Sequence, residues 1–333
     1  MQQPQSAAGA TAALENPRRA EPEPGPAGQP PDTARTPHTR PERLRQRMAL
    51  WLFIVPALVM YIATVIAPSL QSIEISLTDW DGVNAAYNYI GFANYTDIVQ
   101  ADRFWNAVTN TLLLGFGSAV IINVISLGVA LLLDRLRHWQ GLFRTLVYLP
   151  SLMSGFIAAT IWKYILNYNF GVVNTTLREH GMETWAKDWF GDSGLVIWVL
   201  LFVLCFTLGG NTTLIYLANL QSVPRDLVEA ARIDGASGLQ VFRYVTWPML
   251  AGSVTVNMTL GIIAGWTIFD QILVLTAGGP GFVSETMAFF IYKVGFGEYR
   301  AGYGSAAAVL LFLVVMATTV GANHYMRRRE IQA

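Results

Sequence analysis

The chain carries little charge and almost no cysteine, and both shortages narrow what it can be. Charged residues make up 13% of its 333 residues, which is about half the share found in a typical soluble domain. The 22 lysines and arginines equal the 22 aspartates and glutamates in number, so no overall basic field points to nucleic acid as a partner. The single cysteine, Cys205, allows no disulfide within the chain, and the four scattered histidines lack the spacing of metal ligands. We therefore expect neither a metal site nor a nucleic-acid-binding surface.

Catalytic signatures are missing as well. The sequence contains no Gly-x-x-x-x-Gly-Lys-Ser/Thr phosphate loop, so this chain is not expected to hydrolyse ATP itself. It also lacks the Gly-x-Ser-x-Gly and His-Glu-x-x-His patterns of hydrolases, which disfavours an intramembrane enzyme. These absences predict a protein that is not an enzyme and holds no cofactor of its own.

Long apolar runs are what the sequence does contain. Hydrophobic residues make up 53% of the chain, and the mean hydropathy is +0.39. A helix needs about 20 apolar residues to cross a hydrocarbon core of ~30 Å. Six runs are long enough: Met48–Ala67, Val108–Leu133, Thr145–Leu166, Val196–Leu220, Met249–Val274 and Gly302–Ala322. None reads as a strand, so we predict an all-α, polytopic membrane protein with six transmembrane helices.

Composition also divides the chain into zones. Residues 1–47 are rich in proline, are expected to be a disordered tail, and lack the apolar core and cleavage site of a signal peptide. Residues 48–107 are predicted to hold the first transmembrane helix and an interfacial segment, because aromatic rings such as Trp80, Tyr87 and Tyr89 suit the headgroup region. Residues 108–326 form the predicted core, with a polar loop at 222–248, and residues 327–333 form a basic C-terminus.

The distribution of basic residues predicts the orientation in the membrane. Lysine and arginine favour cytoplasmic loops. One set of segments holds Arg40, Arg43, Arg45, Arg47, Arg135, Arg137, Arg144, Arg225, Arg232, Arg243, Arg327, Arg328 and Arg329. The three opposite loops hold only Arg103, Arg178, Lys187, Lys293 and Arg300, with Lys163 near a span end. Both termini and the 222–248 loop are therefore predicted to be cytoplasmic, and the 69–107 segment external.

The polar loop contains a spaced motif. It consists of Glu229-Ala230-Ala231, Gly235, Val245, Trp247 and Pro248. We expect a helix that begins near Pro224, with Ser222 as its cap, and a turn at Gly235 into a second helix. Two small alanines on an exposed stripe would let another protein approach closely. An ordinary cytoplasmic hairpin facing water is the alternative.

This motif resembles the docking signature of the membrane subunits of bacterial ATP-binding-cassette (ABC) importers, with Trp247 in place of the usual leucine. The rest of the chain after residue 47 is similar to the carbohydrate-uptake members, the group that includes the maltose and glycerol-3-phosphate systems. The stretches that carry the similarity are Ser76–Trp80, Gly91–Tyr95, Arg103–Asn106, Asn110-Thr111, Thr276–Gly281, Ser284–Thr286 and Tyr292. The resemblance implies the type I ABC importer permease fold.

The resemblance also implies partners and a mechanism. The expected complex contains a second homologous permease subunit, two ATPase subunits that bind ATP and Mg, and an external solute-binding protein that delivers a sugar. ATP-driven closure of the ATPases would switch the permease between inward-open and outward-open states in the bacterial inner membrane. The residues expected to dock on the ATPase are Glu229, Ala230, Ala231, Asp234, Gly235 and Ala236.

A substrate pathway is predicted where polar residues enter apolar spans. Asp270 and Gln271 follow Trp266 in the fifth run, and a carboxylate in hydrocarbon usually faces a cavity or a partner. An aromatic face and amide or carboxylate groups are what a sugar site needs. Asn211 and Thr212 interrupt the fourth run, and in related importers both regions contribute to the substrate site. Alternatively, Asp270 and Gln271 lie at the external interface or pair with the sister subunit.

An ATP-independent secondary transporter or channel is the competing function. It would share the helical bundle but would leave the Glu229–Gly235 motif without a purpose. Which sugar or sugar derivative is carried cannot be read from the sequence.

Overall fold

The computed structural model describes residue 52 and residues 54–136 and 138–330, with side chains described up to residue 326. The predicted tail at 1–47 and the side chains of the basic C-terminus lie outside this part. The chain divides into a first unit that ends at Tyr61 and a second unit from Ile62 onward. In the first unit, Leu52 and residues 54–61 are helical. Within the described residues there are helices and no strand, apart from an isolated bridge between Thr78 and Tyr89.

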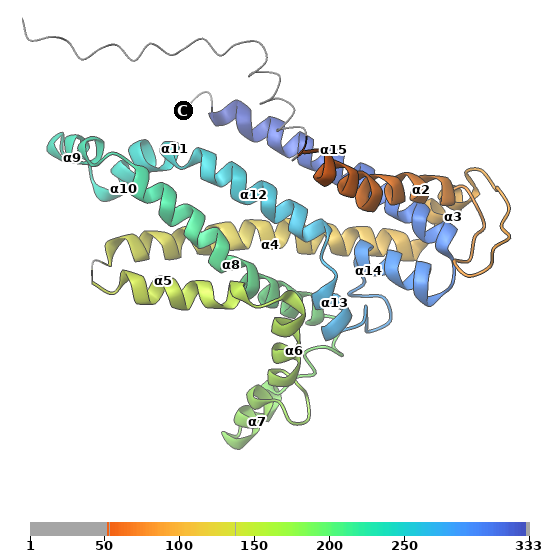
Figure 1. Ribbon diagram of the computed structural model, residues 1–333. Coiled ribbons are helices and arrows are strands. Elements are labelled where there is room, and N and C mark those ends of the chain that lie inside the picture. Colours follow the sequence, from red (N-terminus) through yellow and green to blue (C-terminus); the bar gives the residue numbers. More distant parts are fainter. Residues whose placement is uncertain (1–51, 53, 137, 331–333) are drawn as a thin grey trace, which may run out of the picture. The chain divides into compact units, whose positions relative to one another are not determined.

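The second unit is a succession of helices, which confirms the all-α prediction (Figure 1). Its first half contains η1 (Ile62–Ile66), α2 (Ala67–Ile75), α3 (Ala93–Gln100), α4 (Asp102–Arg135), α5 (Gln140–Tyr148), η2 (Leu149–Leu152), α6 (Gly155–Ile165), α7 (Val172–Glu179) and η3 (Glu183–Trp185). Its second half contains α8 (Val196–Ser222), α9 (Arg225–Ile233), α10 (Gly238–Val241), η4 (Phe242–Thr246), α11 (Trp247–Met249), α12 (Ala251–Trp266), α13 (Asp270–Leu275), α14 (Met287–Tyr292), η5 (Lys293–Gly297) and α15 (Ala301–Glu330).

Four helices in the described residues are each long and apolar enough to span a membrane: Ile54–Ile75, α4, α8 and the Ala301–Met326 part of α15. The described part of the first span runs to Ile75, beyond the predicted end at Ala67, because Ser69, Gln71 and Ser72 continue the helix despite their polarity. The helix α4 likewise begins at Asp102, before the predicted Val108. Hydropathy marks where apolar side chains are, whereas the helix ends where its backbone pattern ends.

Two of the predicted spans are bent. The third is α5 and η2 followed by α6, with a bend of 96° between them. Pro150 lies in η2, and the Ser154 hydroxyl caps α6 by accepting from the Ile157 N–H at 3.3 Å. In the fifth, residues 238–249 meet α12 at 65°, and α12 ends at Trp266 before α13 begins at Asp270. The described part of the chain therefore has up to six spans if each bent pair counts as one.

The core of the bundle is α4 packed against α8 and α12 (Figure 1). Small residues let α4 and α12 approach closely: Gly115 lies against Gly265, and Ala119 lies against Gly261. Between α4 and α8, the Tyr216 hydroxyl donates to Asn123 Oδ1 at 2.5 Å, and both side chains are buried. Small residues thus bring α4 close to α12, whereas a buried hydrogen bond joins α4 to α8.

Candidate functional site: the α9–α10 hairpin and the α12–α13 break

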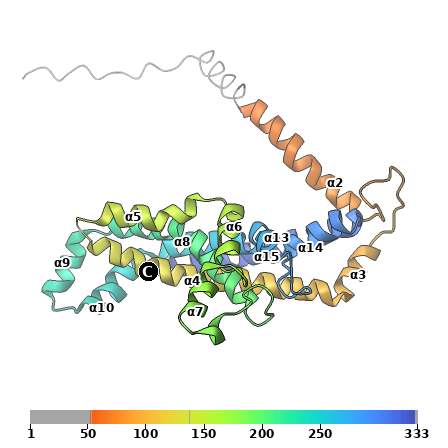
Figure 2. The same ribbon diagram turned by 90° about the horizontal axis from the view of Figure 1, so that it is seen from below.

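The predicted docking loop is a helical hairpin made by α9 and α10. Both views place it at one end of the second unit, away from α13 and α14 (Figures 1 and 2). The helix α9 ends in a Schellman motif, in which the Gly235 N–H donates to the Arg232 carbonyl at 3.1 Å and the Ala236 N–H donates to the Ala231 carbonyl at 3.0 Å. Gly235 has φ +82°, a left-handed value that favours glycine. The turn predicted at Gly235 is confirmed, and the fixed spacing from Ala231 to Gly235 follows from this geometry.

The hairpin's second helix is also capped. The Ser237 hydroxyl accepts from the Gln240 N–H, and the Gln240 side chain accepts from the Ser237 N–H at 2.7 Å, which completes a capping box. The predicted cap for α9 is wrong: Ser222 is the last residue of α8, and its hydroxyl donates to the Asn219 carbonyl. Pro224 takes the N-cap position of α9 with no side-chain cap. The prediction failed because α8 continues to Ser222, two residues beyond the predicted end of its apolar run at Leu220.

The tip of the hairpin is open to solvent. Glu229, Ala230, Asp234 and Gly235 are exposed, whereas Ala231 and Ala236 are half-buried. Glu229 makes no ion pair with any residue in the described ranges. A cavity of about 960 Å³ lies behind the hairpin, between it and the ends of α4 and α8. Its charged lining residues are Asp134, Arg135, Arg225, Glu229 and Arg232. The carboxylate of Glu229 is thus available to a partner and has basic neighbours in its own chain.

The residues predicted for the substrate pathway do not form one cluster. Asp270 and Gln271 open α13, where Asp270 is exposed and Gln271 is 8% exposed. They lie against the start of α6, since a Cβ on Gly155 would be 2.7 Å from Gln271 Nε2 and 3.4 Å from Asp270 Oδ2. The break between Trp266 and Asp270 places this carboxylate at a helix start rather than in the middle of a continuous span.

The other three pathway residues lie elsewhere. Trp266, expected to offer an aromatic face, is 2% exposed and packs with Ala119 and Ile262, so its ring is not accessible in this conformation. Asn211 is exposed and Thr212 half-buried on α8, which is continuous through both residues. The predicted span Val196–Leu220 is therefore confirmed as one helix that its polar residues do not break. A helix accommodates Asn and Thr when their side chains lie on its surface.

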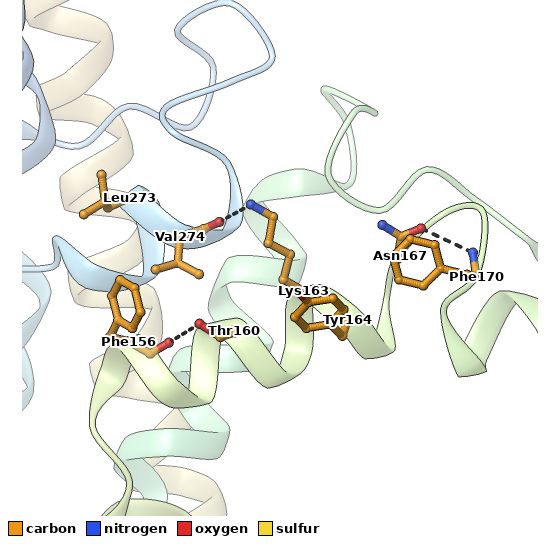
Figure 3. Close-up of a pocket in the computed structure, with 8 residues that line it drawn as sticks. All are labelled: Phe156, Thr160, Lys163, Tyr164, Asn167, Phe170, Leu273 and Val274. Atoms are coloured by element: carbon orange, nitrogen blue, oxygen red, sulfur yellow. Dashed lines mark hydrogen bonds between the residues drawn. The ribbon is translucent and has the colours of Figure 1, made fainter.

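A pocket of about 540 Å³ extends from α13 to α6 (Figure 3). It is lined by Phe156, Thr160, Lys163, Tyr164, Asn167, Phe170, Leu273 and Val274. The Lys163 ammonium donates to the Val274 carbonyl at 2.7 Å and so joins the two helices. From the sequence, Lys163 was identified only as a basic residue near the end of a span, and this pocket was not predicted. A single lysine within an apolar run could have indicated it, because such a residue usually faces a cavity or a partner. Aromatic rings, an amide and an ammonium here could contact a polar ligand.

A bundle of apolar helices with a solvent-exposed helical hairpin at one end defines a multi-pass membrane protein. The chain belongs to the family of binding-protein-dependent transport system inner membrane components, whose family model matches residues 122–331. It is 34% identical over 282 residues to the probable starch degradation products transport system permease protein of Thermoanaerobacterium thermosulfurigenes, covering 85% of this chain and 95% of the relative. It is 30% identical over 281 residues to the trehalose/maltose transport system permease protein of Thermococcus litoralis, covering 84% of this chain and 93% of the relative.

Solved structures confirm the fold class. The chain is similar to a subunit in the crystal structure of a bacterial ABC transporter involved in the import of the acidic polysaccharide alginate, with a TM-score of 0.75 and 22% identity. The match covers 86% of this chain and 98% of the solved one. The protein is thus a permease of the sugar ABC transporter family, with the type I importer fold, in the inner membrane.

Proposed function

We propose that this chain is the translocation subunit of an ABC importer for sugars. It would couple ATP hydrolysis by partner ATPases to solute uptake through alternating access between inward-open and outward-open states. The relatives named for starch products and for trehalose/maltose support a sugar as the solute. The observation that carries the proposal is the capped, solvent-exposed α9–α10 hairpin in a member of this family.

The hairpin is the proposed docking surface for the ATPase. Glu229 and Ala230 face solvent on α9, and Asp234, Gly235 and Ala236 form the turn that follows. Ala231 fixes the turn from within. Because α9 and α10 are capped at the turn, force applied to Glu229 would reach α12 through the short η4 and α11 segments. The other proposed partners are a second homologous permease subunit and an external solute-binding protein.

The proposed solute path runs along the seam of α6 and α13. Asp270 and Gln271 lie at this seam beside Gly155, and Asn211 and Thr212 would contribute from α8 in another conformation. Trp266 would have to leave its packed position to join them. The proposal places no ATP, Mg or metal in this chain, because the partner ATPases would bind the nucleotide.

Replacing Glu229 by Lys tests the coupling. Reversing one charge at a docking surface disfavours association by several kcal/mol, so ATP-driven uptake of maltose or trehalose should fall by about tenfold or more. Uptake would be measured in vesicles that contain the complete transporter, together with the amount of the chain in the membrane. Glu183→Lys makes the same change on an exposed carboxylate in η3, far along the chain from the hairpin, and should be neutral.

Uptake that persists without ATP would favour the secondary transporter or channel instead. Uptake that is normal in Glu229→Lys would remove the hairpin from the mechanism. Asp270→Asn in the same vesicles tests the solute path, because it removes the charge while keeping the shape of the side chain; wild-type transport would argue against that path.

A further inference from the structure

A cluster of charged and polar side chains joins the start of α4 to the segment before α14, and the transport scheme above does not use it. The Arg103 Nε donates to Glu285 Oε2 at 2.7 Å, and the Arg103 Nη2 donates to Glu285 Oε1 at 2.8 Å. The remaining nitrogen, Nη1, donates to Glu298 Oε1 at 2.7 Å. The Glu285 side chain is fully buried, whereas that of Glu298 is 36% exposed. A bidentate contact of this kind fixes the relative orientation of the guanidinium and the carboxylate as well as the distance between them.

Aromatic rings enclose the arginine. Its guanidinium carbon lies 4.4 Å from the centre of the Phe282 ring and 5.1 Å from the centre of the Phe290 ring. Both rings belong to the same stretch as Glu285, one before and one after it. The positive charge is therefore held by two rings and a carboxylate from a single short segment. This pairing leaves the segment little freedom to move away from α4.

The next turns of α4 hold the same segment by its backbone. The Asn110 side chain donates to the Val283 carbonyl at 2.7 Å and to the Glu285 carbonyl at 3.0 Å. The Thr111 hydroxyl accepts from the Met287 N–H at 2.8 Å. This N–H is one of those that the start of α14 leaves without a helical partner. We call the set Arg103, Asn110, Thr111, Glu285 and Thr286 the α4–α14 clasp.

Thr286 links the clasp to the α12–α13 break. It occupies the N-cap of α14, where a threonine hydroxyl usually accepts from its own helix, yet its side chain makes no cap bond. Instead its hydroxyl donates to the Ile268 carbonyl at 3.0 Å, and both residues are buried. Ile268 lies in the break, two residues before Asp270. The neighbour of Glu285 thus holds the backbone that carries Asp270 into α13.

We propose that Arg103 and Glu285 are positioning residues for the solute path: through Thr286 they set where Asp270 and Gln271 stand relative to α6. The expected effect on transport rests on the proposed function. The placement of the start of α13 by these residues does not depend on that function. Neither residue is proposed to touch the solute.

Two matched pairs of variants test the clasp. Thr286→Val removes the hydroxyl while keeping the shape, and Thr286→Ser keeps the hydroxyl. Glu285→Gln breaks the buried pair, and Glu298→Gln changes the exposed carboxylate that contacts the same arginine. Each would be made in a Cys205→Ala background with Asp270→Cys as a reporter. The rate constant for modification of that cysteine by a charged methanethiosulfonate would be measured on protein that elutes as a single folded species.

In Thr286→Val and Glu285→Gln, the cysteine at position 270 should react about tenfold faster or slower than in the unaltered background, which is the equivalent of one lost hydrogen bond. In Thr286→Ser and Glu298→Gln, its rate constant should stay within about twofold of that background. With Asp270 and Cys205 in place, Thr286→Val and Glu285→Gln should raise the KM for maltose or trehalose uptake. A rate constant and a KM do not depend on how much protein folds. A purely structural role would lower only the yield.

Unchanged labelling in Thr286→Val and Glu285→Gln would overturn the proposal. If Glu285→Gln does not fold, the Thr286 pair decides alone. If the wild type shows no ATP-driven uptake, the proposed function fails, and the labelling still decides whether the clasp positions the start of α13.

Discussion

At the scale of single residues, glycine decides how closely α4 and α12 approach. A Cβ on Gly265 would lie 2.1 Å from the Gly115 Cα, a distance that no backbone can accept without moving. A Cβ on Gly261 would lie 3.0 Å from that of Ala119. The close seam brings many backbone and small side-chain atoms into contact, which is how helices associate where there is little hydrophobic driving force. The residue at 265 should therefore be the least tolerant position in α12.

Gly265→Ala should destabilise the fold by about 1–3 kcal/mol or more, because the added methyl forces α4 and α12 apart. The check is a melting curve of the detergent-extracted protein, followed by size-exclusion chromatography. Gly252→Ala is the matched control in the same helix, since a Cβ there meets nothing within 4 Å. It should melt at or slightly above the wild-type temperature, given the helix propensity of alanine. Equal melting of both variants would mean that the seam is not tightly packed.

At the scale of elements, the α9–α10 hairpin depends on one left-handed residue. Gly235 is unobstructed, with no atom within 4 Å of a Cβ built there, so its φ of +82° alone calls for glycine. Gly235→Ala should cost about 1–2 kcal/mol locally. Since the hairpin is exposed, the expected result is a several-fold loss of ATP-driven uptake with an unchanged melting temperature. Gly238→Ala, which is equally unobstructed but does not have positive φ, should behave like the wild type. A normal Gly235→Ala transporter would show that the turn tolerates another geometry.

Among the elements, the turn after α9 could be predicted from the sequence, whereas the bent spans and the α4–α14 clasp could not. The spacing from Glu229 to Gly235 predicted the turn correctly, because a Schellman motif is local and its glycine requirement is written in the sequence. The hydropathy pattern did not predict the bend of 96° before α6 or the bend of 65° before α12, because an apolar run looks the same whether its helix is straight or broken. The α4–α14 clasp was missed for another reason: Arg103 and Glu285 meet across most of the chain, and only the tertiary fold brings them together.

At the scale of the whole molecule, the basic residues behave differently at the two ends of the bundle. Three of the arginines predicted to be external make contacts within the protein, whereas Lys187 is exposed. Arg103 pairs with Glu285 and Glu298, Arg178 donates to the Tyr168 and Asn169 carbonyls, and Arg300 lies 4.1 Å from the centre of the Tyr303 ring. At the hairpin end, Arg135, Arg225 and Arg232 line an open cavity. Asp134 and Glu229 line the same cavity, so its arginines exceed its acidic residues by one.

The larger number of lysines and arginines at the hairpin end predicts that this end faces the cytoplasm. Two single cysteines in a Cys205→Ala background test it: Leu239→Cys, at a residue 76% exposed in α10, and Met182→Cys, at a residue 44% exposed before η3. A membrane-impermeant maleimide added to intact cells should label Met182→Cys and leave Leu239→Cys unmodified until the cells are permeabilised. The opposite labelling would invert the topology and separate the hairpin from any cytoplasmic ATPase. Because the assay needs no solute and no partner, it judges the orientation independently of transport.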